Sequence, residues 1–242
     1  MRIAIISDMH GNCVALDAVV NDLPSVDRMV CLGDAIQGGP QPRETAQRLR
    51  SLSCPVVMGN ADAWLLSGKD TSTVETTTSK MLAIREWSLS QLAEEDIEFI
   101  KGFQPTITIS LDNGHTLLCF HGSPRSFDDI ILPETPEEEF RQLLGDYQTS
   151  FLTGGHTHLQ QIRRLDNTFF FNPGSVGFAY NRHLPEEHFH ADPWAEYAIL
   201  SAENGRISLE FRRVPFNVNR LIEIYLSSGR PYAEDAAAQY RP

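Results

Sequence analysis

The sequence has few of the features that mark secreted, membrane-spanning or disulfide-stabilised proteins. It contains 4 cysteines in 242 residues, and no two of them form a C-x-x-C pair. We therefore expect reduced, buried thiols rather than a disulfide framework. No apolar run approaches the roughly 18 residues of a membrane-spanning helix, and the first apolar run meets Asp8 too early for a secretory signal. These absences predict a soluble, cytoplasmic protein with no membrane partner.

Positive charge is also scarce, with 20 Lys and Arg residues against 32 Asp and Glu residues and a net charge of −12. A surface this acidic repels phosphate backbones at long range, which argues against polymeric nucleic acid as a partner. A small anionic substrate is still compatible with this balance, because carboxylates can hold cations that then attract phosphate.

Two common catalytic motifs are missing as well. The segment Gly174-Ser175-Val176-Gly177 lacks the G-x-S-x-G frame of a serine hydrolase elbow. No G-x-x-x-x-G-K-[ST] phosphate-binding loop occurs, so a P-loop motor or kinase is unsupported.

The patterns that are present predict an α/β protein. With 41% hydrophobic and 21% charged residues, the composition is that of a globular chain. Short β-rich runs are expected at residues 2–7, 28–32, 55–58, 106–111, 116–120, 150–153, 160–165, 168–171, 196–201 and 206–213. Helices are expected at residues 12–23, 41–52 and 218–226. So many strands favour two packed sheets with outer helices.

We expect one domain over residues 1–242, with two segments that depart from this pattern. Residues 62–102 are interpreted as a helical insertion, which includes the Thr- and Ser-rich stretch 71–79 and an amphipathic run at 89–103. Residues 217–242 carry one helix and then an acidic, alanine-rich tail, for which a frayed terminus is favoured over a functional arm.

Five short blocks place metal-binding side chains directly after expected strands. The blocks are Asp8-Met9-His10, Gly33-Asp34, Gly59-Asn60-Ala61-Asp62, His121-Gly122 and Gly155-His156-Thr157-His158. Loops at the carboxyl ends of such strands converge on ligands, so the blocks are candidates for one pocket. Their oxygen and imidazole groups, with no thiolate, suit manganese, with iron, zinc, nickel or magnesium as alternatives.

The ordered set D-x-H, G-D, G-N-x-D, H-G and G-H-x-H resembles the calcineurin-like metallophosphoesterase superfamily over residues 8–158. A further block, Asn172-Pro173-Gly174-Ser175, resembles its small bacterial and archaeal phosphodiesterase branch. The resemblance implies a four-layer αββα sandwich with two divalent ions at one end of the sheets. Asp8, His10 and His158 would bind one ion, Asn60, His121 and His156 the other, and Asp34 would bridge them.

The resemblance also implies a dinuclear phosphoesterase in which a water or hydroxide between the ions attacks phosphorus, with Asp34 and His121 as catalytic residues. The substrate would be a small or nucleotide-like phosphodiester or phosphoanhydride, with diesters preferred to monoesters. Similar proteins often form oligomers, so a homo-oligomer is left open. The competing hypothesis is a catalytically weak or inactive protein-interaction scaffold of the same fold.

One position departs from the pattern of the superfamily. Many relatives carry histidine after the motif asparagine, where it assists the leaving group, but this chain has Ala61. General acid catalysis contributes about 10²–10⁴-fold, and its loss affects poor leaving groups most. We therefore expect a preference for acidic leaving groups, such as those of aryl diesters and polyphosphate anhydrides.

Three further residues each have two interpretations. Asn12 can bind a phosphate oxygen or cap a helix. Arg125 can bind phosphate through two hydrogen bonds or form a surface salt bridge. Asp62 can orient a ligating histidine or cap a helix. Asn172 is expected to be structural, and His115 is expected to be an ordinary polar residue. For His183, His188 and His190 a solvated loop is favoured over a cap on the substrate pocket or a further metal site.

Overall fold

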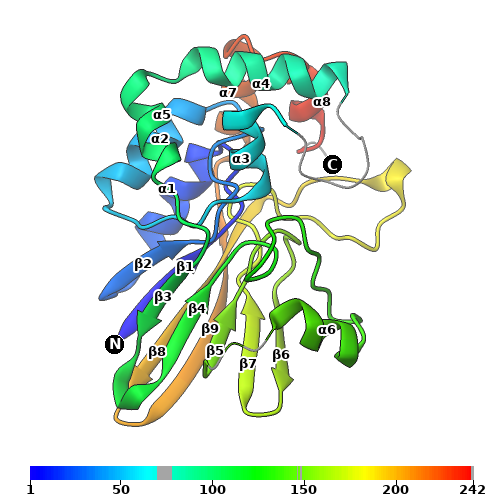
Figure 1. Cartoon of the computed structure of the whole chain (residues 1–242). Coiled ribbons are helices and arrows are strands. Elements are labelled where there is room, and N and C mark those ends of the chain that lie inside the picture. The colour runs from blue at the N-terminus through cyan, green and yellow to red at the C-terminus, as the bar shows by residue number, and fades with distance from the viewer. Residues whose placement is uncertain (70–77, 146, 148, 241–242) are drawn as a thin grey trace.

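Two mixed β-sheets form the centre of the computed structural model, which describes residues 1–69, 78–145, 147 and 149–240 (Figure 1). The first sheet has the order β2-β1-β8-β9 and the second the order β3-β4-β5-β7-β6. The strands of the first sheet are β1 (Arg2–Ile6), β2 (Arg28–Cys31), β8 (Trp194–Glu203) and β9 (Arg206–Pro215). Those of the second are β3 (Ile107–Ser110), β4 (Thr116–Cys119), β5 (Phe151–Thr153), β6 (Gln161–Leu165) and β7 (Thr168–Asn172).

Parallel and antiparallel pairs occur in both sheets. Strand β1 pairs in parallel with β2 and antiparallel with β8, in the register Ile3 to Arg28 and Ile3 to Leu200. In the second sheet, β5 lies in parallel between β4 and β7, while β3 and β6 pair antiparallel at the two edges. The expected sandwich of two mixed sheets is therefore confirmed.

Helices cover the outer faces of both sheets. They are α1 (Cys13–Asp22), α2 (Pro42–Ser51), α3 (Asn60–Ser67), α4 (Ser79–Gln91), α5 (Glu94–Lys101), α6 (Glu137–Leu144), α7 (Val218–Ser227) and α8 (Ala233–Ala238). Helix α6 lies beside β6 and β7, and the others gather at the opposite end of the molecule (Figure 1). Within the described ranges, no helix is long and apolar enough to cross a membrane.

Three hydrophobic clusters fill the spaces between the layers. Strand β1 shows why its sequence is apolar at successive positions, because Ile3 and Ile5 face the second sheet whereas Ile6 faces the helices. A strand buried on both faces needs apolar residues throughout rather than in alternation. On the far side, Phe140 of α6 packs against Phe170 of β7 with ring centroids 5.6 Å apart.

The structure corrects several of the expected elements. Residues 55–58 form two isolated bridges, Val56 to Cys31 and Val57 to Gln104, instead of a strand. Helix α6 was not expected. The helical segment 62–102 contains most of α3 and all of α4 and α5, and the run at 89–103 is broken between Gln91 and Glu94. Residues 71–77 of the Thr- and Ser-rich stretch lie outside the described residues.

The expectation of a frayed C-terminal tail is wrong. Residues 233–238 form α8, and the side chain of Tyr240 beyond it is only 7% exposed. The Tyr240 hydroxyl donates a hydrogen bond of 2.8 Å to the carbonyl of Gly177. Its ring lies 6.2 Å from that of Phe216 and 6.3 Å from that of Tyr225, measured between centroids. The terminal segment is therefore anchored to the body of the protein.

This anchor predicts a measurable loss of stability when it is removed. Replacing a large buried aromatic side chain by alanine leaves a cavity, so Tyr240→Ala should lower the free energy of unfolding by about 3 kcal/mol. Leu226→Ala on α7 is the control, since Leu226 is 50% exposed and its truncation should change stability by less than about 0.5 kcal/mol. Urea denaturation measures both, and equal effects would contradict the anchor.

Candidate metal centre

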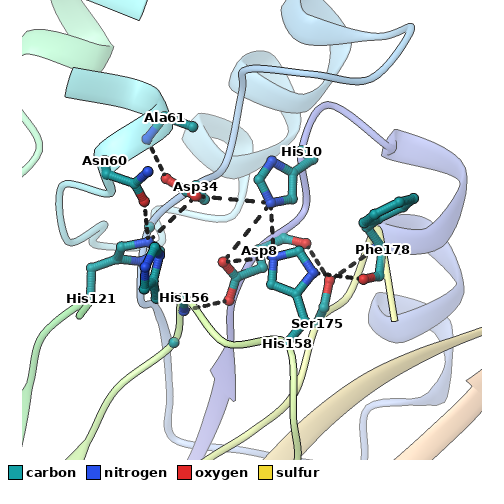
Figure 2. A network of polar contacts seen from close by, with 12 residues as sticks. Asp8, His10, Asp34, Asn60, Ala61, His121, His156, His158, Ser175 and Phe178 are labelled. Carbon is teal, nitrogen blue, oxygen red and sulfur yellow. Dashed lines mark hydrogen bonds and ion pairs between the residues drawn. The ribbon is translucent and has the colours of Figure 1, made fainter. Parts of the chain in front are cut away.

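The five sequence blocks meet at one end of the sheets, as Figure 2 shows. Asp8, Asp34 and His121 follow the ends of β1, β2 and β4, while His156 and His158 follow β5. Asn60 is the first residue of α3. The structure thus brings together all seven of the side chains that the resemblance names as ligands.

The backbone at this site is unusual, because most of these residues adopt left-handed conformations. The φ angles are 54° for Asp8, 46° for His10, 49° for Asp34, 67° for His156 and 55° for His158. Placing a residue that has a Cβ atom in the left-handed region costs on the order of 1–3 kcal/mol of conformational free energy, and such residues cluster at functional sites. These backbone conformations therefore lower the stability of the fold, but they direct the five side chains toward a common point.

The loops also approach one another closely. A Cβ atom at Gly33, whose φ is +100°, would lie 2.6 Å from the backbone nitrogen of Gly59. Only glycine fits there, which explains why it precedes the motif aspartate.

Asp8, His10 and His158 form the first cluster. The two Nε2 atoms lie 3.1 Å apart, and the Nε2 of His158 is 3.4 Å from Oδ1 of Asp8. Asp8 is fully buried, and its Oδ1 atom has no hydrogen-bond partner among the described residues. A buried carboxylate oxygen is costly to leave unpaired, and a cation bound between these three side chains would satisfy it.

Three of the histidines are held in a fixed orientation by main-chain carbonyls. The Nδ1 atom of His10 lies 3.0 Å from the Gln37 oxygen, and that of His158 lies 2.7 Å from the Phe178 oxygen. His121 makes the same contact with the Leu32 oxygen at 2.7 Å. A proton on each Nδ1 makes these hydrogen bonds and leaves a lone pair on Nε2, which is the arrangement that metal-binding histidines adopt.

The second cluster contains Asp34, Asn60, His121 and His156. One donor atom from each of Asp34, His121 and His156 lies within 4.8 Å of the other two. Oδ1 of Asn60 lies 3.0 Å from the Nε2 atom of His121. When Nδ1 of His121 carries the proton, this pair consists of two acceptors, and a cation between them removes the repulsion.

Asp34 stands between the two clusters. Its Oδ2 atom lies 3.4 Å from Nε2 of His121 and 3.9 Å from Nε2 of His10. Its Oδ1 atom accepts a hydrogen bond of 2.8 Å from the backbone nitrogen of Ala61. A single oxygen therefore faces both clusters while the other is held by the start of α3. The donor set and this placement fit a pair of divalent cations that share Asp34.

The charges at the site are strongly coupled. Burial opposes ionisation of Asp34, but the imidazoles of His121 and His10 lower the pKa of its carboxyl well below the usual range. Burial alone would lower the pKa of His121, yet the Asp34 carboxylate raises it to about 9. Burial, followed by the charge of His121, lowers the pKa of His156 to about 4. In the metal-free protein at neutral pH, His121 therefore carries a proton that a cation must displace.

This proton predicts how metal binding depends on pH. As pH falls below 9, the apparent Kd for Mn²⁺ should rise about tenfold per unit, because binding releases the proton of His121. The stability of the metal-free protein changes in the opposite direction and decreases as pH rises. The stabilising pair with Asp34 is fully present below the ordinary pKa of 6.5 and is lost as pH rises through 9. The rise in Tm caused by fixed Mn²⁺ should thus grow between about pH 6.5 and 8.5, and a constant rise would contradict the assignment.

The side chains of Asn12 and Arg125, the two predicted substrate contacts, form hydrogen bonds with other parts of the chain. Oδ1 of Asn12 accepts from the backbone nitrogen of Ala15 at 3.0 Å, and its amide donates to the Gly177 oxygen at 3.0 Å. Asn12 is therefore the N-cap of α1, and the phosphate contact was wrong. The exposed side chain of Arg125 donates to the carbonyl of Gln142 in α6 and forms no salt bridge with any described residue, whereas its phosphate contact stays a prediction.

Asp62 has a different role from either one predicted. Its two carboxylate oxygens accept hydrogen bonds of 3.0 Å from the backbone nitrogens of Ala35 and Ile36. Burial and the nearby charge of Asp34 raise its pKa to about 7. Asp62 therefore fixes the loop that follows Asp34, rather than a histidine or the start of a helix.

Asn172 has the structural role that was expected. Its buried amide donates to the Gly155 oxygen at 2.6 Å and to Oγ1 of Thr157 at 3.1 Å, which braces the loop that carries His156 and His158. Sequence reasoning missed Ser175, whose hydroxyl donates to the main-chain oxygen of Asp8 at 2.8 Å. The remaining histidines, His115, His183, His188 and His190, belong to neither candidate metal group in the described residues.

Comparison with known proteins agrees with this geometry. Residues 1–204 match the model of the calcineurin-like phosphoesterase superfamily domain, and the chain belongs to this superfamily. It is therefore a member of a metal-dependent phosphoesterase family, as the resemblance implied.

Individual proteins are similar over nearly the whole chain. A metallophosphoesterase from Sphaerobacter thermophilus is 26% identical, with a TM-score of 0.75 over 99% of this chain and 97% of that one. The hypothetical protein PH1004 from Pyrococcus horikoshii OT3 shares the fold at 18% identity, with a TM-score of 0.79 over 98% of this chain and 96% of that one. The uncharacterized protein MJ0912 from Methanocaldococcus jannaschii is 25% identical over 248 residues, covering 95% of this chain and 93% of its own.

Proposed function

We propose that the chain is a dinuclear metal-dependent phosphoesterase that hydrolyses a phosphodiester or phosphoanhydride bond of a small or nucleotide-like substrate. The observation that carries this proposal is the position of Asp34 Oδ2, which faces Nε2 of both His10 and His121. Together with the donors of six other side chains it completes a set of seven oxygen and nitrogen ligands, and none is a thiolate. Manganese suits this set, with iron, zinc, nickel or magnesium as alternatives.

The chain's own residues would hold the ions and leave the site attractive to phosphate. Two bound divalent ions lower the pKa of a water and clamp the oxygens of an in-line displacement at phosphorus. The seven ligands carry only two formal negative charges, those of Asp8 and Asp34. The loaded site would therefore be net positive and would attract a phosphate in spite of the chain's charge of −12. We place this activity in the cytoplasm, on a small phosphorylated substrate rather than a nucleic acid polymer.

The test begins with protein stripped of metal by a chelator and reloaded with Mn²⁺. Hydrolysis of bis(p-nitrophenyl) phosphate and of p-nitrophenyl phosphate is then measured before and after loading. We expect turnover only in the loaded protein, and faster turnover of the diester. Absence of hydrolysis with every metal of the set would overturn the proposal and favour the scaffold alternative.

The alanine at position 61 predicts which esters are hydrolysed fastest. The backbone nitrogen of Ala61 donates a hydrogen bond to Asp34, and the methyl side chain of Ala61 has no proton to give to a leaving group. Rates across aryl diesters of graded leaving-group pKa should therefore fall steeply as that pKa rises, whereas a flat dependence would contradict this interpretation. Ala61→His should accelerate the poorest substrates by about 10²-fold. Ala63→His, two residues further along α3, is the control and should not.

A further inference from the structure

A cavity of about 500 Å³ opens directly onto the candidate metal centre. Its floor includes His10, Asp34, His156 and His158, and its far wall comes from the C-terminal segment after residue 224. The family match ends at residue 204, so this wall lies outside the matched region. A wall that is not part of the matched domain but borders its metal site can determine which substrate fits.

One of the two cationic side chains that line the cavity has no matching carboxylate among the described residues. Lys80 and Arg230 line the cavity, and Asp34 is the sole carboxylate among the described lining residues. Lys80 is paired with Asp235 at 2.8 Å, outside the lining. Among the described residues, no carboxylate lies within ion-pair distance of Arg230. On a chain with net charge −12, an unpaired guanidinium in the site marks a place for an anion.

Backbone carbonyls hold the guanidinium of Arg230 in a fixed position. Its Nε donates to the Gly38 oxygen at 2.8 Å, and its Nη1 donates to the oxygens of Pro231 at 2.9 Å and Tyr232 at 3.3 Å. Its Nη2 has no hydrogen-bond partner in the described part of the chain. Because three carbonyls fix the rest of the group, this nitrogen is available to a ligand in the cavity at little entropic cost.

The same loop positions Arg230 and a metal ligand. The carbonyl of Gln37 accepts from Nδ1 of His10, and the next carbonyl, that of Gly38, accepts from Arg230. Arg230 also lines the same cavity as His10 and Asp34. An anionic group on Arg230 would therefore share this cavity with a phosphate at the metal centre.

An aromatic cluster forms another part of the cavity. Phe178, Tyr180 and Phe189 have ring centroids 5.4–5.9 Å apart, and all three line the cavity. Tyr180 lies 5.6 Å from the ring of His158. Flat, partly exposed rings of this kind bind a nucleobase or another planar group by stacking or edge contacts.

From these features we propose that the site is built for a phosphoanhydride of the nucleoside polyphosphate type, and that Arg230 determines this specificity. One phosphate would occupy the metal centre, the adjacent phosphate would bind Arg230, and a base would contact the aromatic cluster. Water adds across the anhydride: its oxygen bonds to one phosphorus, the bridging P–O bond breaks, and its protons are released as the products ionise. This inference rests on the proposed phosphoesterase function.

The test compares two substrates in the Mn²⁺-loaded full-length protein. Diadenosine triphosphate has an adjacent phosphate, whereas bis(p-nitrophenyl) phosphate has none. Arg230→Gln should lower kcat/KM for the first by about 10- to 100-fold, through KM, and change that for the second by less than about threefold. Arg220→Gln is the matched control, since Arg220 is exposed on α7 and pairs with Glu223 at 3.2 Å. It should change neither.

Equal losses on both substrates would show that Arg230 only positions the His10 loop, and no loss would show that it has no role; either result overturns the inference. A second measurement needs no variant. At fixed free Mn²⁺, ADP should inhibit wild-type hydrolysis of bis(p-nitrophenyl) phosphate at least tenfold more strongly than AMP does, and equal inhibition would overturn the inference. Failure of the wild type to hydrolyse either substrate would instead reject the proposed function.

Discussion

Asp34→Asn is expected to lower kcat/KM by at least about 10³-fold while leaving the fold intact. Oδ2 of Asp34 faces both histidine clusters, at 3.4 Å from His121 and 3.9 Å from His10. An amide keeps the acceptor for the Ala61 nitrogen but replaces the shared anionic oxygen by a group that is neutral and a poor bridge. The variant should therefore bind the second metal weakly and lose the reaction.

The control for this variant is Asp166→Asn. Asp166 pairs with Arg141 at 2.7 Å on an exposed surface, so its neutralisation should alter kcat/KM by less than about twofold. Thermal unfolding separates loss of activity from loss of the fold. Metal-free Asp34→Asn lacks the stabilising pair with His121, so at neutral pH its Tm should fall below that of the metal-free wild type, but it should still unfold in one cooperative transition. Full activity in Asp34→Asn would refute the bridging role.

His158→Ala has the second large expected effect, the loss of one metal ion per chain. His158 and His10 present Nε2 atoms 3.1 Å apart, and His158 also lies 3.4 Å from the unpaired oxygen of Asp8. Removing one imidazole leaves the first cluster with two protein ligands besides the shared Asp34. We expect metal content to fall from two ions to one, and activity to fall by about 10³-fold, because a two-metal displacement needs both ions.

His183→Ala is the matched control for His158→Ala. His183 is exposed and belongs to neither candidate metal group in the described residues, so its removal should leave two ions per chain and full activity. Metal content is measured by inductively coupled plasma mass spectrometry after gel filtration. Retention of both ions in His158→Ala would contradict the assignment of the first cluster.

The convergence of the candidate ligands could be predicted because it depends on residue type and order. Asp8, Asp34, His121 and His156 each follow an apolar run, and the carboxyl ends of neighbouring strands meet at one edge of a sheet. The continuous apolar run of β1 likewise predicts a strand buried on both faces, as Ile3 and Ile6 show. These features are local in the sequence and need no knowledge of side-chain direction.

The contacts around the ligands could not be predicted in the same way. Asn12 and Asp62 carry suitable groups at suitable places, but each is used by nearby backbone nitrogens. Which way such a side chain turns depends on the tertiary position of the loop it serves. The left-handed backbone at five ligands is also invisible in the sequence, because aspartate and histidine carry no general preference for it strong enough to predict.

The C-terminal wall was missed for a different reason. Helix α8 is short and alanine-rich, so it offers no apolar periodicity, and its place depends on the distant contact between Tyr240 and Gly177. Helix α6 did leave a signal that could have been read, because Pro136 precedes three glutamates and then the apolar Phe140 and Leu144. The position of α8 thus depends on long-range packing rather than on local sequence preference.

The most direct test of the central claim is a crystal structure of the protein soaked with Mn²⁺, with data collected at the manganese absorption edge. The account predicts two anomalous peaks per chain. One should be bounded by Asp8, His10 and His158, the other by Asn60, His121 and His156, with Asp34 bound to both ions. A single peak, or peaks away from these side chains, would contradict it.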